Sequence, residues 1–201
     1  YTEKLLFGQK TGIDLPNEKQ GFVPSPEWKK LKFKVPWLQG DTVVFAIGQG
    51  AVCVTPLQMA YITAAIANKG IVHKPYVVDK VLDLEGNEIY KYKELPNNKK
   101  IELSDRTWDF LHKSLLQVVE NGTARRCKIH GIKISGKTGT AQNPHKKDHA
   151  WFISYAPSDN PEIAVAVIVE NGGSGGLSSV PIAKKIYETY FGISSSVQEI
   201  Q

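Results

Sequence analysis

The stretch Gly131-Ile-Lys-Ile-Ser-Gly-Lys-Thr-Gly-Thr-Ala-Gln142 decides how the rest of the chain is interpreted. Its β-branched residues and glycines favour a strand over residues 131–141. Because successive side chains of a strand point to opposite faces, Lys137 and Gly139 would share one face. The bare glycine would let an extended substrate lie close to the strand, and the hydroxyls of Thr138 and Thr140 would be available to the substrate's carboxylate.

Residues 131–138 also match the phosphate-binding loop pattern G-x-x-x-x-G-K-[ST]. Such a loop needs a glycine-rich turn that opens directly into a helix, so that backbone N–H groups and the helix dipole face the anion. Here Ile132 and Ile134 are strand formers, and residues 140–148 are a poor helix start. The strand is therefore the preferred interpretation, and a nucleotide-binding protein is the weaker one.

Two further strands are expected beyond this stretch. Residues 151–155 are rich in aromatic side chains, and Ile163–Val169 is continuously apolar, as in a strand buried on both faces. Residues 156–161, Ala-Pro-Ser-Asp-Asn-Pro, predict a tight turn between them. After a loop over residues 171–179, Pro181 is expected to open a terminal helix. Five residues of that helix would point inward: Ile182, Ala183, Ile186, Tyr187 and Tyr190.

Two helices are expected before these strands. The first covers residues 55–69, with Thr55 as its N-cap and Gly70 as its stop. The second covers residues 104–120 and has a regular apolar stripe. His112 lies on that stripe, and we expect it to be a hydrogen-bonded core histidine rather than a functional one.

The remaining segments are a surface hairpin and a proline-rich start. Residues 77–84 and 88–92 flank a Glu-Gly-Asn turn, which predicts two short antiparallel strands. In residues 1–41, prolines interrupt any periodicity, so this segment is an ordered loop or a linker, and the ordered loop is favoured because four aromatic residues would pin it: Phe22, Trp28, Phe33 and Trp37. Helices followed by three strands and a final helix indicate the α+β class.

The composition is that of an ordinary folded domain. Of the 201 residues, 41% are hydrophobic and 22% are charged, which excludes a disordered or collagen-like chain. A net charge of +5 is too small and too dispersed to indicate a nucleic-acid partner. The longest apolar run, Ile163–Val169, is far shorter than the roughly 20 residues that span a bilayer. The basic clusters are expected to be solvated, with an acidic polymer or an anionic membrane surface as the alternative.

The cysteines and histidines do not predict a metal site. Cys53 and Cys127 have no CxxC spacing, so two separate thiols are expected, although the sequence leaves a disulfide between them open. His145, Asp148 and His149 share one short loop before a strand, where solvated side chains are the expected interpretation. No metal and no cofactor is predicted.

Lys137-Thr138-Gly139 is a triplet found in penicillin-binding proteins and serine β-lactamases, and it does not stand alone in this chain. The motifs that accompany it are, in chain order, Gly12-Ile-Asp-Leu-Pro16, Pro36-Trp-Leu-Gln-Gly-Asp-Thr42, Ile47-Gly-Gln-Gly50, Thr55-Pro-Leu-Gln-Met59, the continuation of the triplet to Gln142, residues 152–157 and residues 169–173. On these motifs, residues 8–192, apart from the charged hairpin over residues 80–103, closely resemble the class B penicillin-binding proteins, and above all those that act in cell-wall elongation.

The resemblance implies an α+β transpeptidase fold of the penicillin-binding protein and serine β-lactamase type, with this chain as its C-terminal half. It also implies a D,D-transpeptidase that cross-links peptidoglycan stem peptides through a serine acyl-enzyme and is inhibited by β-lactams. Lys137, Thr138 and Gly139 would be its catalytic triplet, in which Lys137 supplies positive charge near the nucleophile. Thr140 and Gln142 would bind the substrate, and the backbone N–H of Thr140 would complete the oxyanion hole.

One departure from the family pattern concerns the nucleophile. The family carries Ser-x-x-Lys and Ser-x-Asn motifs before the triplet, and no Ser-x-x-Lys occurs in these 201 residues. Ser158-Asp-Asn160 has the letters of the second motif, but it follows the strand in a proline-flanked turn and is interpreted as turn chemistry. We therefore expect the nucleophile and its base upstream of Tyr1, and we expect this chain alone not to be acylated.

The resemblance also implies a setting for the intact protein. Residues 1–193 would form the C-terminal portion of a transpeptidase domain, and residues 194–201 a tail. The protein would act on the periplasmic face of the bacterial inner membrane, held there by an N-terminal anchor absent from this chain. Its partners would be peptidoglycan stem peptides, β-lactam antibiotics, a RodA-type polymerase and MreC.

Two other functions stay open at this stage. The chain could belong to a non-catalytic sensor or binding module that kept the fold and lost the serine. It could also belong to the division-specific transpeptidase, which differs from the elongation enzyme in its cellular role and not in its chemistry.

Overall fold

The computed structural model describes residues 5, 7–93 and 100–193, so the expected tail over residues 194–201 lies outside the described residues. The chain forms two compact units. The first contains residues up to 65 together with 70–102, and the second contains residues 66–69 and everything from 103 onward. Among the described residues, no helix combines the length and the apolar character needed to cross a bilayer.

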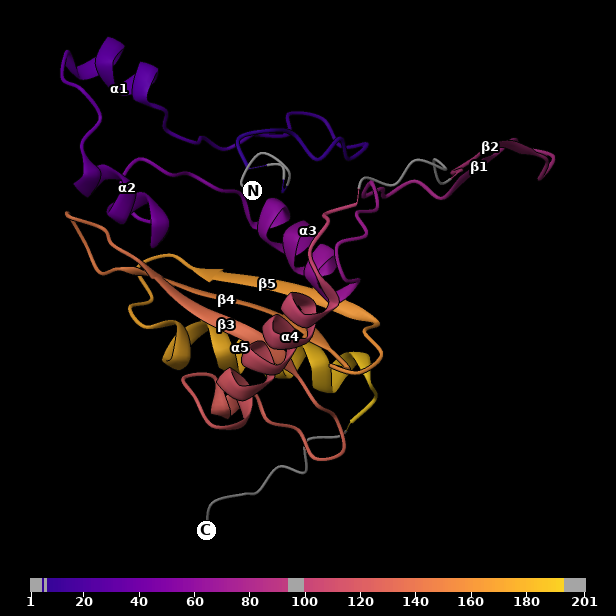
Figure 1. Cartoon of the computed structure of the whole chain (residues 1–201). Helices are drawn as coiled ribbons and strands as arrows, with labels where there is room; N and C mark the ends of the chain where they lie inside the picture. Colours follow the sequence, from indigo (N-terminus) through magenta and orange to yellow (C-terminus); the bar gives the residue numbers. More distant parts are fainter. Residues whose placement is uncertain (1–4, 6, 94–99, 194–201) are drawn as a thin grey trace. The chain divides into compact units, whose positions relative to one another are not determined.

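The first unit is built from short helices and a hairpin (Figure 1). Its elements are α1 (Pro26–Phe33), α2 (Gln39–Ala46), most of α3 (Pro56–Ala67), β1 (Lys80–Leu82) and β2 (Glu88–Lys91). The predicted hairpin is confirmed, with Val81 opposite Tyr90 and every strand residue exposed. Residues 94–99, which follow it, lie outside the described residues.

The expectation of a loop throughout residues 1–41 is wrong, because α1 and the start of α2 lie in it. Ser25 caps α1 by accepting a hydrogen bond from the Trp28 backbone N–H at 3.1 Å, and Pro26 occupies the first helical position, where no N–H is needed. The aromatic pinning is confirmed: the Trp28 ring lies 4.9 Å from Phe22 and 5.4 Å from Phe33 between centroids.

The helix predicted over residues 55–69 is confirmed as α3, and its first turn has a reciprocal cap. The Thr55 hydroxyl accepts a hydrogen bond from the Gln58 backbone N–H at 3.1 Å. The Gln58 side-chain oxygen Oε1 in turn accepts one from the Thr55 backbone N–H at 2.9 Å. Gly70 follows the helix with φ +91° and donates to the Ala65 carbonyl.

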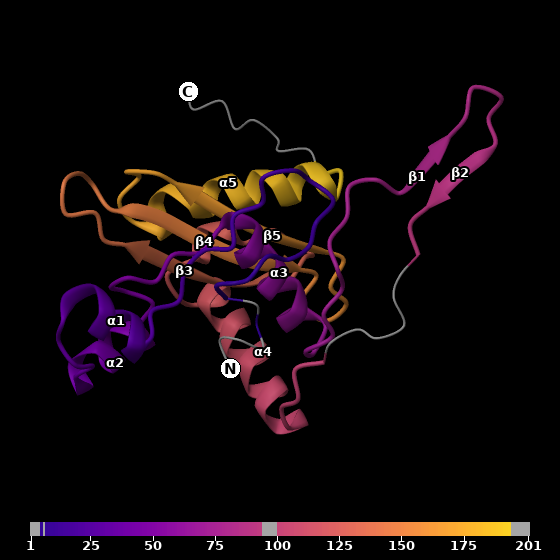
Figure 2. The same ribbon diagram turned by 90° about the horizontal axis from the view of Figure 1, so that it is seen from above.

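The second unit is a three-stranded antiparallel sheet flanked by two long helices (Figures 1 and 2). Its elements are α4 (Asp105–Glu120), a short 3₁₀ turn η1 (Arg125–Cys127), β3 (Ser135–Ala141), β4 (His149–Ala156), β5 (Ile163–Val169) and α5 (Gly175–Tyr190). The strand order is β3-β4-β5. This is the α+β arrangement that the sequence predicted.

The main core lies between the sheet and α5. Phe152 of β4 packs there with Val180, Ala183 and Tyr187 of α5, and all four side chains are fully buried. The Tyr187 hydroxyl donates to Ser154 Oγ at 2.8 Å, so the same face of β4 also supplies a buried polar contact. Side chains that share a face with Phe152 therefore point toward α5.

α4 packs against β3: Val119, near its end, joins the core with α5, whereas His112 reaches the opposite face of the sheet at Tyr155. The His112 ring lies 5.8 Å from the Tyr155 ring between centroids, and His112 Nε2 is 2.7 Å from the Ile66 carbonyl oxygen. The prediction of a hydrogen-bonded core histidine is thus confirmed.

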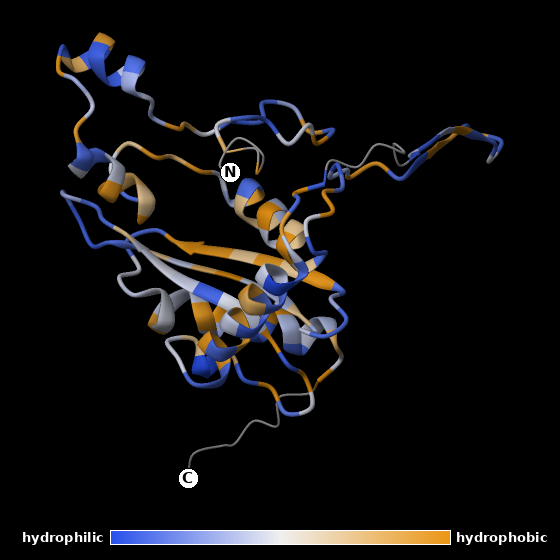
Figure 3. Ribbon diagram, in the orientation of Figure 1, coloured by the Kyte–Doolittle hydropathy of each residue, from blue (hydrophilic) through white to orange (hydrophobic). Residues whose placement is uncertain are grey.

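The predicted strands are confirmed with changes at their ends. β3 begins at Ser135 rather than at Gly131, because Gly131 has φ +82° in a turn closed by an Ile129–Ile132 bridge. β5 is not buried on both faces: only Val165 and Val167 are buried. Figure 3 shows that β5 is nonetheless hydrophobic along its length, whereas β3 is pale and carries a hydrophilic segment.

The expected start of the terminal helix at Pro181 is wrong. α5 begins at Gly175, after Ser174 in extended conformation, so part of the predicted loop over residues 171–179 is helical and Pro181 lies inside the helix. The inward face is also narrower than predicted, since Ala183 and Tyr187 are buried whereas Ile182, Ile186 and Tyr190 are exposed. The sequence pattern failed because the two glycines that open the helix, Gly175 and Gly176, have low intrinsic helix propensity.

Candidate active site

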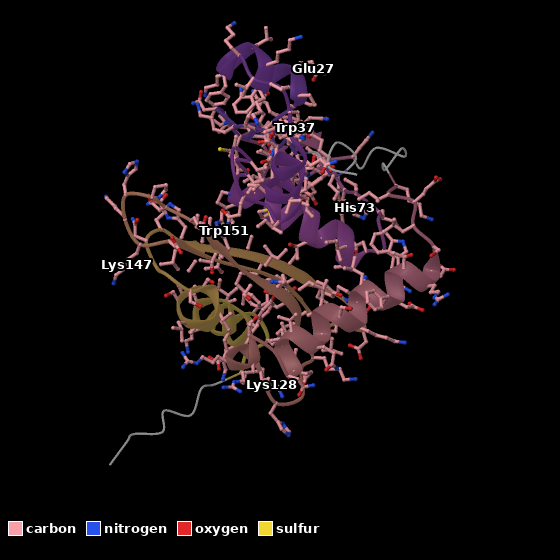
Figure 4. The ribbon with its side chains drawn as sticks, turned by 60° about the vertical axis from the view of Figure 1, so that its left-hand side comes forward. Glu27, Trp37, His73, Lys128, Lys147 and Trp151 are labelled. Atoms are coloured by element: carbon pink, nitrogen blue, oxygen red, sulfur yellow. The ribbon has the colours of Figure 1, made fainter. Side chains whose placement is uncertain are left out.

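Lys137 and Gly139 lie on the face of β3 that points away from α5. β3 pairs with β4 in a register that puts Lys137 opposite Ile153 and Gly139 opposite Trp151, whereas Thr138 is opposite Phe152. Because Phe152 belongs to the core against α5, Thr138 faces α5 and the other two residues face the opposite way. Figure 4 shows Trp151 on the side of the sheet away from α5.

β3 is one of the two outer strands of the sheet in the part of the chain that the structure describes. Its inner edge pairs with β4 over all seven residues, and its outer edge faces no other strand among those described. An extended peptide could therefore add to this edge by backbone hydrogen bonds, as a further strand does.

The Lys137 ammonium is exposed and donates to the Thr138 carbonyl at 2.6 Å. An exposed lysine ammonium on a flexible stem can turn toward an anion. A carboxylate or a developing oxyanion on this face of β3 would therefore meet a positive charge.

Gly139 leaves this face of the strand bare beside Lys137. A Cβ placed on Gly139 would lie 3.3 Å from the Trp151 Cβ, which is tighter than ordinary packing. The Trp151 side chain is itself only half-buried. Gly139 thus leaves the strand backbone uncovered between the exposed Lys137 ammonium and the Trp151 ring.

The structure does not put the Thr138 hydroxyl on the same face as Lys137. Thr138 Oγ1 lies 2.7 Å from Thr123 Oγ1, on the α5 side of the strand. Thr140 is exposed and shares the Thr138 face by alternation, and Gln142 is exposed one residue beyond the strand. Of the five predicted site residues, the structure therefore brings Lys137 and Gly139 together most directly.

Ser158, from the Ser-Asp-Asn sequence, lies in the turn after β4 and contacts only the beginning of β3. Its hydroxyl oxygen is 2.8 Å from Ser135 Oγ, and its backbone N–H donates to the Lys133 carbonyl at 2.9 Å. The interpretation of this sequence as turn chemistry is therefore confirmed. The structure also contradicts the phosphate-loop alternative, because the Gly-Lys-Thr residues continue a strand and do not open a helix.

The face of the sheet that carries Lys137 becomes apolar at the end near Tyr155. Burial raises the pKa of the Tyr155 phenol above its ordinary value, and the hydroxyl of Ser135 nearby partly opposes the shift. Tyr155 is thus a neutral core residue rather than an acid or base in this part of the site.

The β3–β4 loop holds its polar residues in a hydrogen-bonded scaffold. Asp148 Oδ1 accepts from the Asn143 N–H at 3.1 Å, and His149 Nδ1 accepts from the Asn171 N–H at 3.0 Å. Lys147 lies at the outer end of this loop (Figure 4). Within the described ranges, no three histidine, cysteine, aspartate or glutamate side chains are grouped as metal ligands would be.

Three residues that adjoin the site were not predicted: Trp151, Thr123 and Gly175. Trp151 follows from the strand register, which the sequence suggests only once β3 and β4 are paired. Thr123 follows the helix predicted over residues 104–120, and Gly175 lies in the loop predicted over residues 171–179. Their contacts with β3 join segments that are far apart in the sequence, so no local pattern could have found them.

Comparison with known proteins agrees with this geometry. Residues 1–188 match the family model described as "Penicillin binding protein transpeptidase domain". The chain therefore belongs to the penicillin-binding-protein transpeptidase family. Within this family it is similar to penicillin-binding protein 2, the protein also called MrdA. The resemblance and the fold expected from the sequence are thereby confirmed.

The relatives give the extent of this similarity. The chain is 38% identical over 198 residues to the peptidoglycan D,D-transpeptidase MrdA of Acinetobacter baumannii, covering 90% of this chain and 29% of that protein. It is 38% identical, with a TM-score of 0.81, to Pseudomonas aeruginosa PBP2 in complex with WCK 5153, covering 94% of this chain and 42% of the other. For Helicobacter pylori PBP2 in complex with MreC, the identity is 32%, the TM-score 0.71 and the coverage 94% and 35%. The chain thus spans less than half the length of each of these proteins.

Proposed function

We propose that this chain is the substrate-aligning part of a peptidoglycan D,D-transpeptidase that works through a serine acyl-enzyme. The observation that carries the proposal is the placement of Lys137 and Gly139 on one open face of an outer strand. Family membership and similarity to D,D-transpeptidases support the chemistry. The serine and its general base would come from residues other than these 201.

In the proposed reaction, the serine oxygen attacks the carbonyl carbon of the penultimate D-alanine of a stem peptide. The base takes the serine proton, a C–O bond forms, and the terminal D-alanine leaves as the amine after protonation. An amino group of a second stem peptide then attacks the ester, forms the cross-linking amide and releases the serine. A β-lactam would acylate the same serine through its ring carbonyl. Because the amine released by ring opening stays attached to the acyl group, the acyl-enzyme would persist.

The residues of this chain would bind and orient the peptide during both steps. The donor peptide would run along the outer edge of β3, over the bare Gly139. The Lys137 ammonium would stabilise negative charge near the nucleophile and the substrate carboxylate. The Thr140 backbone N–H would donate to the oxyanion, and removing one such donor typically costs about 3–4 kcal/mol.

The Thr138, Thr140 and Gln142 side chains are proposed to support the substrate carboxylate and the backbone of the peptide. The contact between Thr138 and Thr123 makes the Thr138 hydroxyl a weaker candidate for direct contact than the Thr140 hydroxyl, which is exposed. The main role of Thr138 would then be to fix the position of β3 through its contact with Thr123, and contact with the substrate would be a minor role.

The cellular setting follows from the same similarity. We propose that the intact protein acts in cell-wall elongation at the periplasmic face of the inner membrane, through an anchor outside these residues. The complex of Helicobacter pylori PBP2 with MreC supports MreC as a partner, and a RodA-type polymerase is proposed with it.

Fluorescent-penicillin labelling tests the function. The 201-residue chain and the longest native product of its gene are labelled in parallel, followed by mass mapping of the labelled residue. Covalent labelling of a serine in the long product, and none in the short chain, is the expected result. If neither product is labelled, the enzyme proposal fails and a non-catalytic binding module takes its place.

A further inference from the structure

The first turn of α5 packs directly against the backbone of β3 and β4 at the candidate site. A Cβ placed on Gly175 would lie 2.7 Å from the Gly139 carbonyl oxygen and 2.3 Å from the Trp151 carbonyl oxygen. Real Cβ atoms do not approach other heavy atoms this closely, and both neighbours are backbone atoms that cannot rotate away. Only glycine at position 175 allows this separation between helix and sheet.

The contact comes from the face opposite Lys137. α5 covers the Phe152 side of the sheet, whereas a Cβ on Gly139 would meet only the Trp151 Cβ within 4 Å and no atom of α5. Gly175 therefore cannot touch a ligand that lies on the Lys137 side of the strand. Any influence on such a ligand must pass through the position of β3 itself.

A second contact holds the neighbouring residue of the strand. Thr123, in the turn after α4, places its hydroxyl 2.7 Å from the Thr138 hydroxyl. The Thr123 backbone is held in turn by α5, because a Cβ on Gly176 would lie 2.7 Å from the Thr123 carbonyl oxygen. Two consecutive glycines of α5 thus support two consecutive residues of the Lys-Thr-Gly triplet, one directly and one through Thr123.

We propose that Gly175 and Thr123 are positioning residues for the reactive strand, and that they set the position of the Thr138–Gly139 backbone from behind. This inference rests on the proposed function, since it assigns residues to the alignment of that substrate. Misplacement of reacting groups by about 1 Å can cost on the order of 100-fold in rate. A methyl group added at position 175 would push α5 and β3 apart, and the strand would move by a comparable distance.

The test uses the longest native product of the gene and the rate of acylation by a β-lactam, measured as a function of β-lactam concentration. This separates the affinity of the first complex from the rate of the chemical step. Thermal unfolding is followed on the same samples. The variants are Gly175→Ala and the pair Thr123→Val and Thr123→Ser, because serine keeps the hydroxyl and valine keeps the shape.

Val180→Ala is the matched control. Val180 is fully buried in the same helix and belongs to the core cluster rather than to the contacts with Gly139 and Thr123, so its truncation should lower the unfolding temperature without removing those contacts. Its acylation rate per folded molecule is expected to stay within about twofold of the parent. A purely structural role for Gly175 would give the same pattern as this control.

We expect Gly175→Ala to slow the chemical step by at least about tenfold, more than Val180→Ala at an equal loss of unfolding temperature. Thr123→Val should slow it severalfold, and Thr123→Ser should restore it. The proposal is overturned if Gly175→Ala is acylated at the parental rate or slowed no more than the control. If Gly175→Ala does not fold, the Thr123 pair decides, and equal rates for Val and Ser overturn the proposal. Failure of the parent itself to be acylated would count against the proposed function, which this design keeps separate.

Discussion

Trp151 of β4 lies directly opposite Gly139 of β3, and a Cβ on the glycine would come within 3.3 Å of the tryptophan Cβ. Cross-strand neighbours share a face of the sheet, so the only residue of β3 that could cover the ring at this point has no side chain. The bare strand and the half-buried ring together form the surface along which the proposed substrate would lie.

Gly139→Val is therefore expected to block acylation by a β-lactam while the protein still folds. The two valine methyl groups would stand on the Lys137 face, where the peptide is proposed to lie, and would also crowd Trp151. Labelling with fluorescent penicillin and the unfolding temperature are measured together. Normal labelling of a folded Gly139→Val protein would show that the substrate does not follow this strand.

Lys137→Ala is expected to slow acylation by at least about 100-fold, because the positive charge beside the proposed nucleophile is lost. The side chain is exposed and its one hydrogen bond is to a neighbouring backbone carbonyl, so the unfolding temperature should hardly change. Lys133→Ala is the control, since it removes the same charge from an exposed position just before β3. Equal rates for the two variants would contradict the role assigned to Lys137.

Gln58 is expected to be essential for the stability of the first unit. Its side chain is fully buried, donates to the Gln9 and Gln20 carbonyls at 2.7 and 2.8 Å, and accepts from Thr55. Gln58→Leu would leave these backbone groups without that partner, at a cost of about 2–4 kcal/mol in the free energy of unfolding. Hydrogen exchange in this unit measures the loss. An exchange pattern like that of Gln39→Leu, an exposed control, would refute the expectation.

Cys127 is expected to make the second unit sensitive to alkaline pH. Burial raises the pKa of its thiol from 9.0 to about 12; Lys184 lowers it by a smaller amount, and Glu188 raises it slightly. The unfolded thiol loses its proton first, so the stabilising contribution is complete below pH 9 and is lost as the pH rises toward 12. The slope should reach up to about 1.4 kcal/mol per pH unit.

Denaturant unfolding of the parent and of Cys127→Ala between pH 8 and 11 checks this prediction. Tyr187, whose pKa burial also raises, remains in both proteins, and only the smaller part of its shift that comes from Cys127 is lost in the variant. The variant should be less stable at pH 8 and should lose stability less steeply thereafter. Parallel curves would mean that the buried thiol is not the titrating group.

Both cysteines are free thiols, but only Cys53 is exposed. At neutral pH, Cys53 should therefore react with thiol reagents and the buried Cys127 should not.

Much of the fold was predictable because its elements are defined by short-range patterns. The cap of α3, the hairpin of β1 and β2 and the apolar run of β5 each depend on residues a few positions apart. The errors have the same origin. The sequence did not predict α1, because Pro26 was interpreted as a break although it is the first helical residue. The start of α5 was predicted too late, because Pro181 was interpreted as a first helical residue although it lies inside the helix.

The sequence by itself determined that Lys137 and Gly139 share one face of a strand, because side-chain alternation is a property of the extended backbone alone. Only the tertiary structure decided which face that is, since it depends on where α5 packs. It also decided that Thr138 is held by Thr123 and that Gly175 lies against Gly139. These contacts join separate elements, and their closeness is set by packing across the core rather than by any pattern along the chain.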